Sequence, residues 1–274
     1  MKLLLGSLVV ELNGVGFPLA DAYSDLDKFS TEGPVDFVVD ASFGDEPLEK
    51  WRNVELLPGV VDRSERRVTF RRSSCRAVVD LDARHVSMEI GGRWALAVEL
   101  LLIPVIEVMA LELRRGAVFH ASSAVGGGLA AVFMGRSGAG KTTAGRLAGS
   151  VGAEVVSEEI TYVALEPQGA RLYALPFRQK HQLAAPGPST HPVRTFYALE
   201  QDGRDRIEPL PHSECVKRLL TSVVVGVRDR AFTLPALEVC EALAGRVPVR
   251  RLRFRKTPAF WSLVSEDLRA TAAQ

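Results

Sequence analysis

The chain has 274 residues, of which 47% are apolar and 24% charged, the composition of a soluble globular protein with enough material for one large domain or two smaller ones. Its 34 basic and 33 acidic residues leave a net charge of +1, which excludes a general electrostatic attraction to nucleic acid, so we expect no nucleic acid partner. The three cysteines are widely spaced and fit a reducing compartment rather than a disulfide framework or a zinc site.

Residues 1–92 are expected to form a β-rich N-terminal domain, a candidate for substrate or partner recognition. Short segments rich in β-branched and aromatic residues alternate with Gly, Pro, Asp and Asn, a pattern that predicts strands joined by turns. Glu11 interrupts the apolar run at the N-terminus and no cleavage site follows, so a strand is expected there rather than a signal peptide. The predicted strands cover residues 3–12, 35–43, 66–73, 75–82 and 85–94.

A strongly apolar segment follows at residues 94–116. Its three carboxylates, Glu99, Glu107 and Glu112, are too costly for a bilayer span, so the segment is predicted to be a buried helix. The helical pattern is strongest over residues 103–115, and Gly116 is expected to end it. We therefore expect no membrane partner and a cytoplasmic protein.

Residues 93–274 are predicted to form a nucleotide-binding domain in which strands and helices are mixed. Ser213 is a candidate N-cap of one helix and Pro235 the candidate first residue of another. A mostly polar tail follows the last strand. The expected strands are 117–125, 129–135, 153–165, 171–177, 193–201 and 246–254, and the expected helices are 142–152, 213–225 and 235–245.

The segment GRSGAGKTT follows an apolar strand and opens a helix, the context that a P-loop (Walker A) motif requires. Its glycines let backbone N–H groups turn toward phosphate oxygens, and the helix N-terminus adds attraction for an anion. Lys141 is expected to bind the β- and γ-phosphates, and the Thr142 hydroxyl to ligate Mg²⁺. The residues predicted to bind the nucleotide are Gly135, Arg136, Ser137, Gly138, Ala139, Gly140, Lys141, Thr142 and Thr143.

A pair of acids, Glu158 and Glu159, follows Lys141 on a predicted strand that can lie beside the P-loop strand. Adjacent residues of an ideal strand point to opposite faces, so only one of the two would face the phosphates unless the strand is irregular. One carboxylate could hold Mg²⁺, and the other could accept the proton of an attacking hydroxyl. A solvated strand edge is the alternative. His120, on the strand that enters the glycine turn, is a third candidate.

The order of these parts resembles the HPr kinase/phosphorylase family, which shares its P-loop fold with the phosphoenolpyruvate carboxykinases. The shared features are His120 followed by small residues, a β-hairpin, the glycine-rich segment, a short helix and a paired acid, over roughly residues 117–166. The resemblance implies an α/β (α+β) fold, in which a mixed-sheet P-loop kinase core follows the β-rich N-terminal region along the chain. It also implies ATP and Mg²⁺ as cofactors and leaves a homo-oligomer open.

Matched position by position, Lys141 and Thr142 correspond to the family's phosphate and metal residues. Glu158 corresponds to the acid that contributes to metal binding and to activating the hydroxyl, Glu159 to the second acid, and His120 to the histidine near them. This assigns catalysis to Glu158, Glu159, His120 and Lys141, and metal binding to Thr142 and Glu158. A glutamate stands at 158 where the family usually has an aspartate, which lengthens the arm by one methylene.

The leading hypothesis is therefore an ATP-dependent kinase that phosphorylates a hydroxyl, expected to be that of serine, on a protein, peptide or small molecule. The alternative is a non-catalytic or weakly hydrolytic nucleotide-binding regulator. Arg178, Lys180 and His181, in a long loop, could add a cation to the transferring phosphoryl group. A basic segment at 246–256 reads either as an edge strand protected by charge or as a docking strand for an acidic partner.

Overall fold

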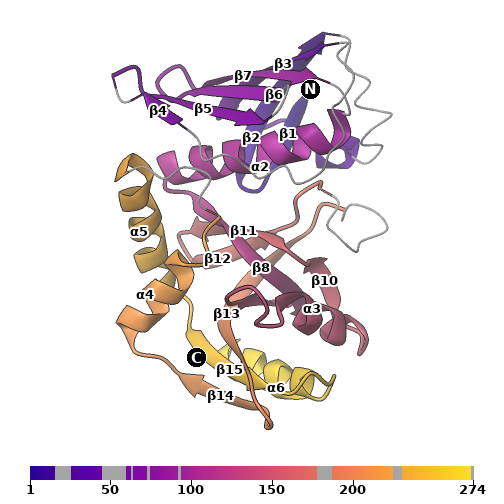
Figure 1. The fold of residues 1–274 in the computed structure, drawn as a ribbon. Helices are drawn as coiled ribbons and strands as arrows, with labels where there is room; N and C mark the ends of the chain where they lie inside the picture. The colour runs from indigo at the N-terminus through magenta and orange to yellow at the C-terminus, as the bar shows by residue number, and fades with distance from the viewer. Residues whose placement is uncertain are drawn as a thin grey trace. The chain divides into compact units, whose positions relative to one another are not determined.

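Two mixed β-sheets organise the chain, one in each of two units defined by internal contacts (Figure 1). The first unit comprises Met1–Leu113 and Val224–Pro235, and the second comprises Arg114–Val223 and Ala236–Gln274. Helix α2 (Trp94–Glu112), which begins just after the boundary expected at residue 92, packs against strands of the first unit. The computed structural model describes residues 1–15, 26–44, 60–62, 64–72, 75–91, 94–177, 187–224 and 230–272.

The first unit contains a seven-stranded sheet of order β1-β2-β3-β7-β6-β5-β4. Strand β3 is parallel to both of its neighbours, and the other pairs are antiparallel. The single first strand predicted from the sequence is wrong, because Gly6 takes a φ of 68° and turns the chain into a hairpin. The strands are β1 (Lys2–Leu5), β2 (Leu8–Val15), β3 (Phe37–Gly44), β4 (Val60–Asp62), β5 (Arg67–Arg72), β6 (Cys75–Asp80) and β7 (His85–Gly91), with a 3₁₀ turn η1 at Leu26–Phe29.

Helix α2 confirms the predicted apolar helix but is longer at its N-terminal end than the expected 103–115. It ends at Glu112, since Arg114 takes a left-handed φ of 52° and strand β8 starts at Gly116. A Cβ at residue 116 would lie 2.3 Å from the Val163 carbonyl oxygen, so only glycine fits there. Within the described residues, no helix is both long and apolar enough to cross a membrane.

The second unit contains an eight-stranded mixed sheet. Its order is β10-β8-β11-β12-β13-β15-β14, with β9 paired to both β8 and β13. Strand β13 is parallel to β9 and to β15. The strands are β8 (Gly116–Gly126), β9 (Leu129–Met134), β10 (Glu154–Ser157), β11 (Ile160–Glu166), β12 (Gly169–Tyr173), β13 (Thr190–Gln201), β14 (Arg206–Pro209) and β15 (Val249–Phe254).

The predicted helices of the second half are present, with three corrections. The residue at the N-cap of α4 is Pro211, so Ser213 lies inside the helix rather than capping it. Helix α5 begins five residues before Pro235, which therefore lies within the helix. The tail expected to be polar folds into α6 and buries one face. The helices are α3 (Lys141–Gly149), α4 (His212–Leu220), α5 (Arg230–Ala244) and α6 (Phe260–Ala272).

Helices α3 and α6 share one hydrophobic core on one face of the second sheet. The Phe133 ring of β9 lies 5.8 Å from Tyr197, 6.0 Å from Phe260 and 6.4 Å from Trp261, measured between ring centroids. Offset and edge-on aromatic pairs at these separations stabilise beyond their buried area. The cluster fixes the C-terminal end of β9, from which the glycine-rich segment departs.

We predict that Phe260→Ala lowers the free energy of unfolding by about 3–5 kcal/mol, because it empties a large buried site. The side chain is fully buried against Phe133 and Phe254. Urea denaturation measures the change. Leu237→Ala on α5 is the control, since Leu237 is 37% exposed. This substitution should change the free energy of unfolding by no more than about 0.5 kcal/mol. Equal effects of the two substitutions would contradict the assigned core.

Candidate functional site

A glycine loop, residues 135–140, connects the end of β9 to the start of α3, in the strand–loop–helix order predicted. Gly138 and Gly140 take φ values of 80° and 104°, a region that residues with a Cβ rarely occupy. At Gly135 a Cβ would lie only 2.7 Å from the Cβ of Ala139. The loop is therefore a tight turn whose shape depends on its glycines.

Lys141, the first residue of α3, places its ammonium group inside this turn. Its Nζ donates to the carbonyl oxygens of Gly135 at 3.0 Å and Arg136 at 3.3 Å. Burial lowers the pKa of Lys141, and the negative charge of Glu159 opposes that shift. Gly140 at the N-cap has no side chain to cap the first-turn N–H groups. A cation and uncapped helix N–H groups thus converge on one point, the arrangement that favours an anion.

Strand β8 holds the first turn of α3 in place. The Ser122 hydroxyl donates to the carbonyl oxygen of Lys141 at 2.6 Å, in the buried interior. One turn later Gly145 faces the same serine, and a Cβ there would lie 3.4 Å from the Ser122 Cβ. The small buried residues Ala144 and Ala148 complete the contact face of the helix. Small side chains therefore let α3 approach the sheet closely.

The tandem acids lie at a bend between β10 and β11, which corrects two sequence expectations. They are not inside one strand, and their strands pair with β8 rather than with β9. The register of β10 shifts between Val155 and Ser157, and hydroxyl groups fix the bend. Ser157 Oγ donates to the carbonyl oxygen of Ile160 at 2.7 Å, and Thr161 Oγ1 donates to that of Ala121 at 2.9 Å. The alternation of faces expected in an ideal strand does not hold at such an irregularity.

Glu158 turns toward helix α3. Its side chain is 8% exposed, and Oε1 lies 3.4 Å from Nε of Arg146. Arg146 is four residues after Thr142, so the two lie one above the other on the same face of α3. The buried carboxylate therefore faces the helix surface that also carries Thr142.

Glu159 turns toward His120, with 3.8 Å between Oε1 and Nε2, and both side chains are half exposed. Burial lowers the pKa of His120, the charge of Lys141 lowers it further, and Glu159 raises it. The backbone holds the pair in place, since His120 is opposite Ile160 in the sheet and donates its N–H to Ser222 at 2.7 Å. Three predicted residues, His120, Lys141 and Glu159, thus form one electrostatic group.

Two contacts at this site were not anticipated from the sequence. Arg146 reads as an ordinary helix-surface cation, and only its pairing with Glu158 gives it a role. Gln201, at the end of β13, donates to the Gly138 carbonyl at 2.7 Å and ties down the tip of the glycine loop. No local motif marks either residue, since each contact joins two segments that only the tertiary fold brings together. Arg178, Lys180 and His181, proposed as further cations, lie outside the described residues.

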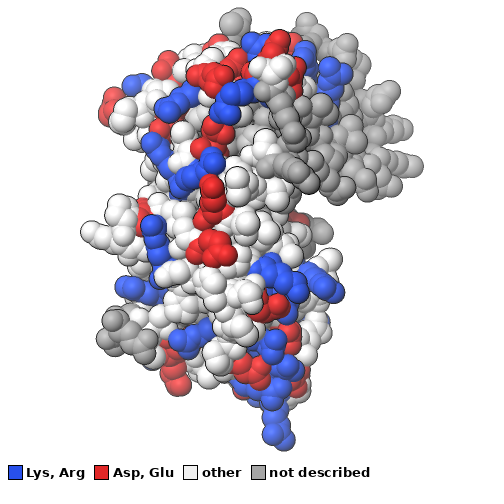
Figure 2. Space-filling model, turned by 90° about the vertical axis from the view of Figure 1, so that its left-hand side faces the viewer, with Lys and Arg blue, Asp and Glu red and all other residues white. Residues whose placement is uncertain are grey.

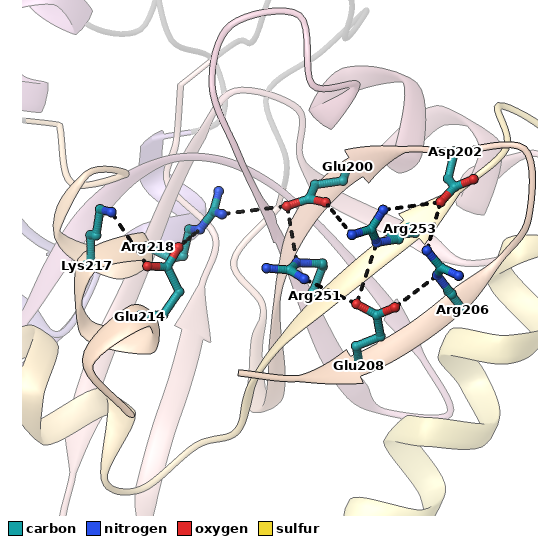
Figure 3. Close-up of polar contacts among 9 residues, drawn as sticks. All are labelled: Glu200, Asp202, Arg206, Glu208, Glu214, Lys217, Arg218, Arg251 and Arg253. Atoms are coloured by element: carbon teal, nitrogen blue, oxygen red, sulfur yellow. Dashed lines mark hydrogen bonds and ion pairs between the residues drawn. The ribbon is translucent and has the colours of Figure 1, made fainter. Parts of the chain in front are cut away.

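The basic segment corrects another expectation. Strand β15 is not an edge strand, because β14 pairs with it. Leu252 and Phe254 share its buried face as predicted, and Arg251 and Arg253 lie on the opposite face. There the two arginines contact Glu200 and Glu208 within 3.5 Å (Figure 3), which neutralises the positive stripe. On the surface drawn in Figure 2, basic and acidic side chains likewise lie interspersed.

The described residues contain no cluster of three or more His, Cys, Asp or Glu side chains that could hold a metal by itself. Mg²⁺ bound with a nucleotide does not need such a cluster, since phosphate oxygens and water supply most of its ligands. The hydroxyl of Thr142 and the carboxylate of Glu158, on the same side of α3, provide oxygen donors of the required kind. This donor set fits a nucleotide-bound Mg²⁺.

No protein-family model matches the chain, and no curated protein matches its sequence. Among solved structures, it is similar to the Hpr(Ser) kinase/phosphatase from Coxiella burnetii, with 10% sequence identity and a TM-score of 0.34. The alignment covers 57% of this chain and 99% of that one. A TM-score this low supports neither a shared fold nor a shared function, so the resemblance to the HPr kinase/phosphorylase family stays a proposal.

We predict that substitutions on either side of His120 move its imidazole pKa in opposite directions. Lys141→Met removes a positive neighbour and should raise that pKa, whereas Glu159→Gln removes a negative neighbour and should lower it. In the unsubstituted protein the pKa should lie below the ordinary value of 6.5. An NMR titration of the histidine ring reports all three. Shifts in the same direction in both variants would contradict the grouping.

Proposed function

We propose that the chain is an ATP-dependent kinase that transfers the γ-phosphoryl group to a hydroxyl of a protein, peptide or small molecule. One observation carries this proposal. The ammonium of Lys141 is held in the glycine loop by two carbonyl groups, and α3 is fixed through Ser122 to the same strand that carries His120, which lies 3.8 Å from Glu159. A phosphate-binding cation beside a carboxylate and an imidazole is what phosphoryl transfer to a hydroxyl requires.

The glycine loop would bind the triphosphate. Its backbone N–H groups and the first turn of α3 face the anion, and Lys141 exchanges its contacts to Gly135 and Arg136 for the β- and γ-phosphates. The backbone donors need no reorganisation, because the Gln201 contact fixes the tip of the loop and the Ser122 contact fixes the residue that follows it. Preorganised donors of this kind stabilise the charge of the transferring group.

Thr142 and Glu158 would hold Mg²⁺ against the phosphates, directly or through water. When bound, the ion neutralises charge on the β- and γ-oxygens. Arg146 keeps the Glu158 carboxylate on the Thr142 side of α3.

Glu159 would accept the proton of the acceptor hydroxyl. The hydroxyl oxygen then bonds to the γ-phosphorus while the bond from that phosphorus to the β–γ bridging oxygen breaks, and ADP leaves with that bond's electron pair. His120, whose pKa is lowered by burial and by the charge of Lys141, lies 3.8 Å from Glu159 and would orient that carboxylate toward the acceptor. As half-exposed groups, both are accessible to an acceptor.

A regulator that binds the nucleotide without transferring phosphate is the second candidate. The ion pair between Arg146 and Glu158 favours it, because a carboxylate already neutralised by a cation has less charge to offer Mg²⁺. The two candidates agree on nucleotide binding and differ only in transfer.

We predict that Glu159→Gln reduces phosphoryl transfer about 10²–10⁴-fold and leaves nucleotide affinity nearly unchanged, because it removes the base but not the phosphate contacts. The assay follows label from γ-labelled ATP into a panel of serine peptides and polyols, and fluorescent-nucleotide binding measures affinity separately. Glu154→Gln is the matched control, since Glu154 is an exposed acid on β10. This variant should transfer phosphate at the normal rate.

Lys141→Met is predicted to weaken Mg²⁺–ATP binding at least tenfold through loss of the phosphate-binding cation. Binding that is unaffected by this substitution would sink the proposed site as a whole. If the unsubstituted protein binds Mg²⁺–ATP and releases phosphate but transfers none to any acceptor, the regulator would instead be supported.

A further inference from the structure

A pocket lies beside the start of the glycine loop, within the second unit. Its floor comes from the ends of β9 and β13, and helix α4 with the two residues after it forms one wall. The lining residues are Met134, Gly135, Arg136, Ala198, Glu214, Lys217, Arg218, Thr221 and Ser222.

The pocket carries an excess of positive charge in a chain whose overall charge is nearly balanced. Three cations line it against one carboxylate. Arg218 is bound to Glu214 at 2.7 Å, whereas Lys217 lies 3.6 Å from Glu214 with its side chain 70% exposed. The exposed Arg136 makes no ion pair with any residue that the structure describes. Lys217 and Arg136 therefore retain most of their capacity to bind an anion.

An ion-pair network fixes the wall that carries these cations. Figure 3 shows the contacts running from Lys217 through Glu214 and Arg218 to Glu200, and from there to the arginines of β15. Glu200 lies two residues beyond Ala198 in β13, so both side chains lie on one face of the sheet. The network thus joins α4 to the sheet face that forms the pocket floor.

The pocket is next to the predicted position of the γ-phosphate. Lys141, which binds the β- and γ-phosphates in the proposed function, contacts the carbonyl groups of Gly135 and Arg136, and these two residues also line the pocket. On the other side, the Ser222 carbonyl in the pocket wall accepts the N–H of His120 at 2.7 Å. The pocket therefore adjoins the donor end of the nucleotide, and its wall is joined by this backbone hydrogen bond to His120, the neighbour of the proposed base Glu159.

We propose that this pocket binds an anionic group, a carboxylate or a phosphate, carried by the hydroxyl acceptor. The proposal rests on the kinase function above and defines its substrate class. The cations of Lys217 and Arg136 contact the anion, while the hydroxyl of the same molecule reaches toward Glu159. Neutral alcohols lack that attachment and are poor acceptors.

The test uses the full chain with the glycine loop first filled by Mg²⁺ and a non-hydrolysable ATP analogue, so that no probe competes for that loop. Glycerate, glycerol 3-phosphate and glycerol are then titrated by calorimetry or NMR. The three share hydroxyl groups, and the first two distinguish a carboxylate from a phosphate as the bound group. We expect at least one of the anions to bind and glycerol not to bind.

Lys217→Ala should weaken binding of the anionic probe about tenfold, since one charge-assisted contact is lost. Lys217→Arg should largely restore it. Lys256→Ala, at an exposed lysine outside the pocket, removes the same charge and should change nothing. Analogue binding without binding of either anion, equal binding of glycerol, or equal losses in Lys217→Ala and Lys256→Ala would overturn the pocket proposal. Failure of the analogue itself to bind would instead refute the proposed function.

Discussion

The attachment of the first turn of α3 to strand β8 is the contact on which the site depends. The Ser122 hydroxyl meets the carbonyl of Lys141 at 2.6 Å in the dry interior, where a lost hydrogen bond is costly. It fixes the residue that carries the ammonium group to the strand that also carries His120, two residues before the serine. Because alternate residues of a strand share a face, the side chains of His120 and Ser122 both lie on the α3 side of the sheet. Close packing by Ala144 and Gly145 is what allows this contact.

The sheet order then brings distant parts of the chain to that point. Strand β8 pairs with β9, β10 and β11, so the glycine loop, the paired acids and the histidine all depart from its neighbourhood. The bend at the acids gives them separate partners, with Glu158 on Arg146 and Glu159 on His120. One acid is therefore buried beside a cation and the other is half exposed. The two acids thus have different environments, as the two separate roles proposed for them require.

The sequence predicted the features that depend on residues close together along the chain. The glycine loop, its strand and its helix were readable because the motif and the apolar runs lie within one short segment. The bend at Glu158 was not, because it depends on a register shift against β8 and on a hydrogen bond from Thr161 to the carbonyl of Ala121, far back in the sequence. Likewise β15 could not be recognised as an inner strand before the short β14 was known to pair with it. Helix α6 had a readable signal, since Phe260, Val264 and Leu268 recur every fourth residue, but its many polar residues concealed it.

Hydrogen exchange followed by mass spectrometry tests the central claim most directly, because it reads the backbone amides that would surround the phosphates. On saturation with Mg²⁺ and a non-hydrolysable ATP analogue, peptides spanning Gly135 to Thr143 should become strongly protected, with smaller changes around Glu159 and none in the first sheet. Saturating analogue that leaves the exchange of the glycine loop unchanged, or that protects a different part of the chain, would contradict the account.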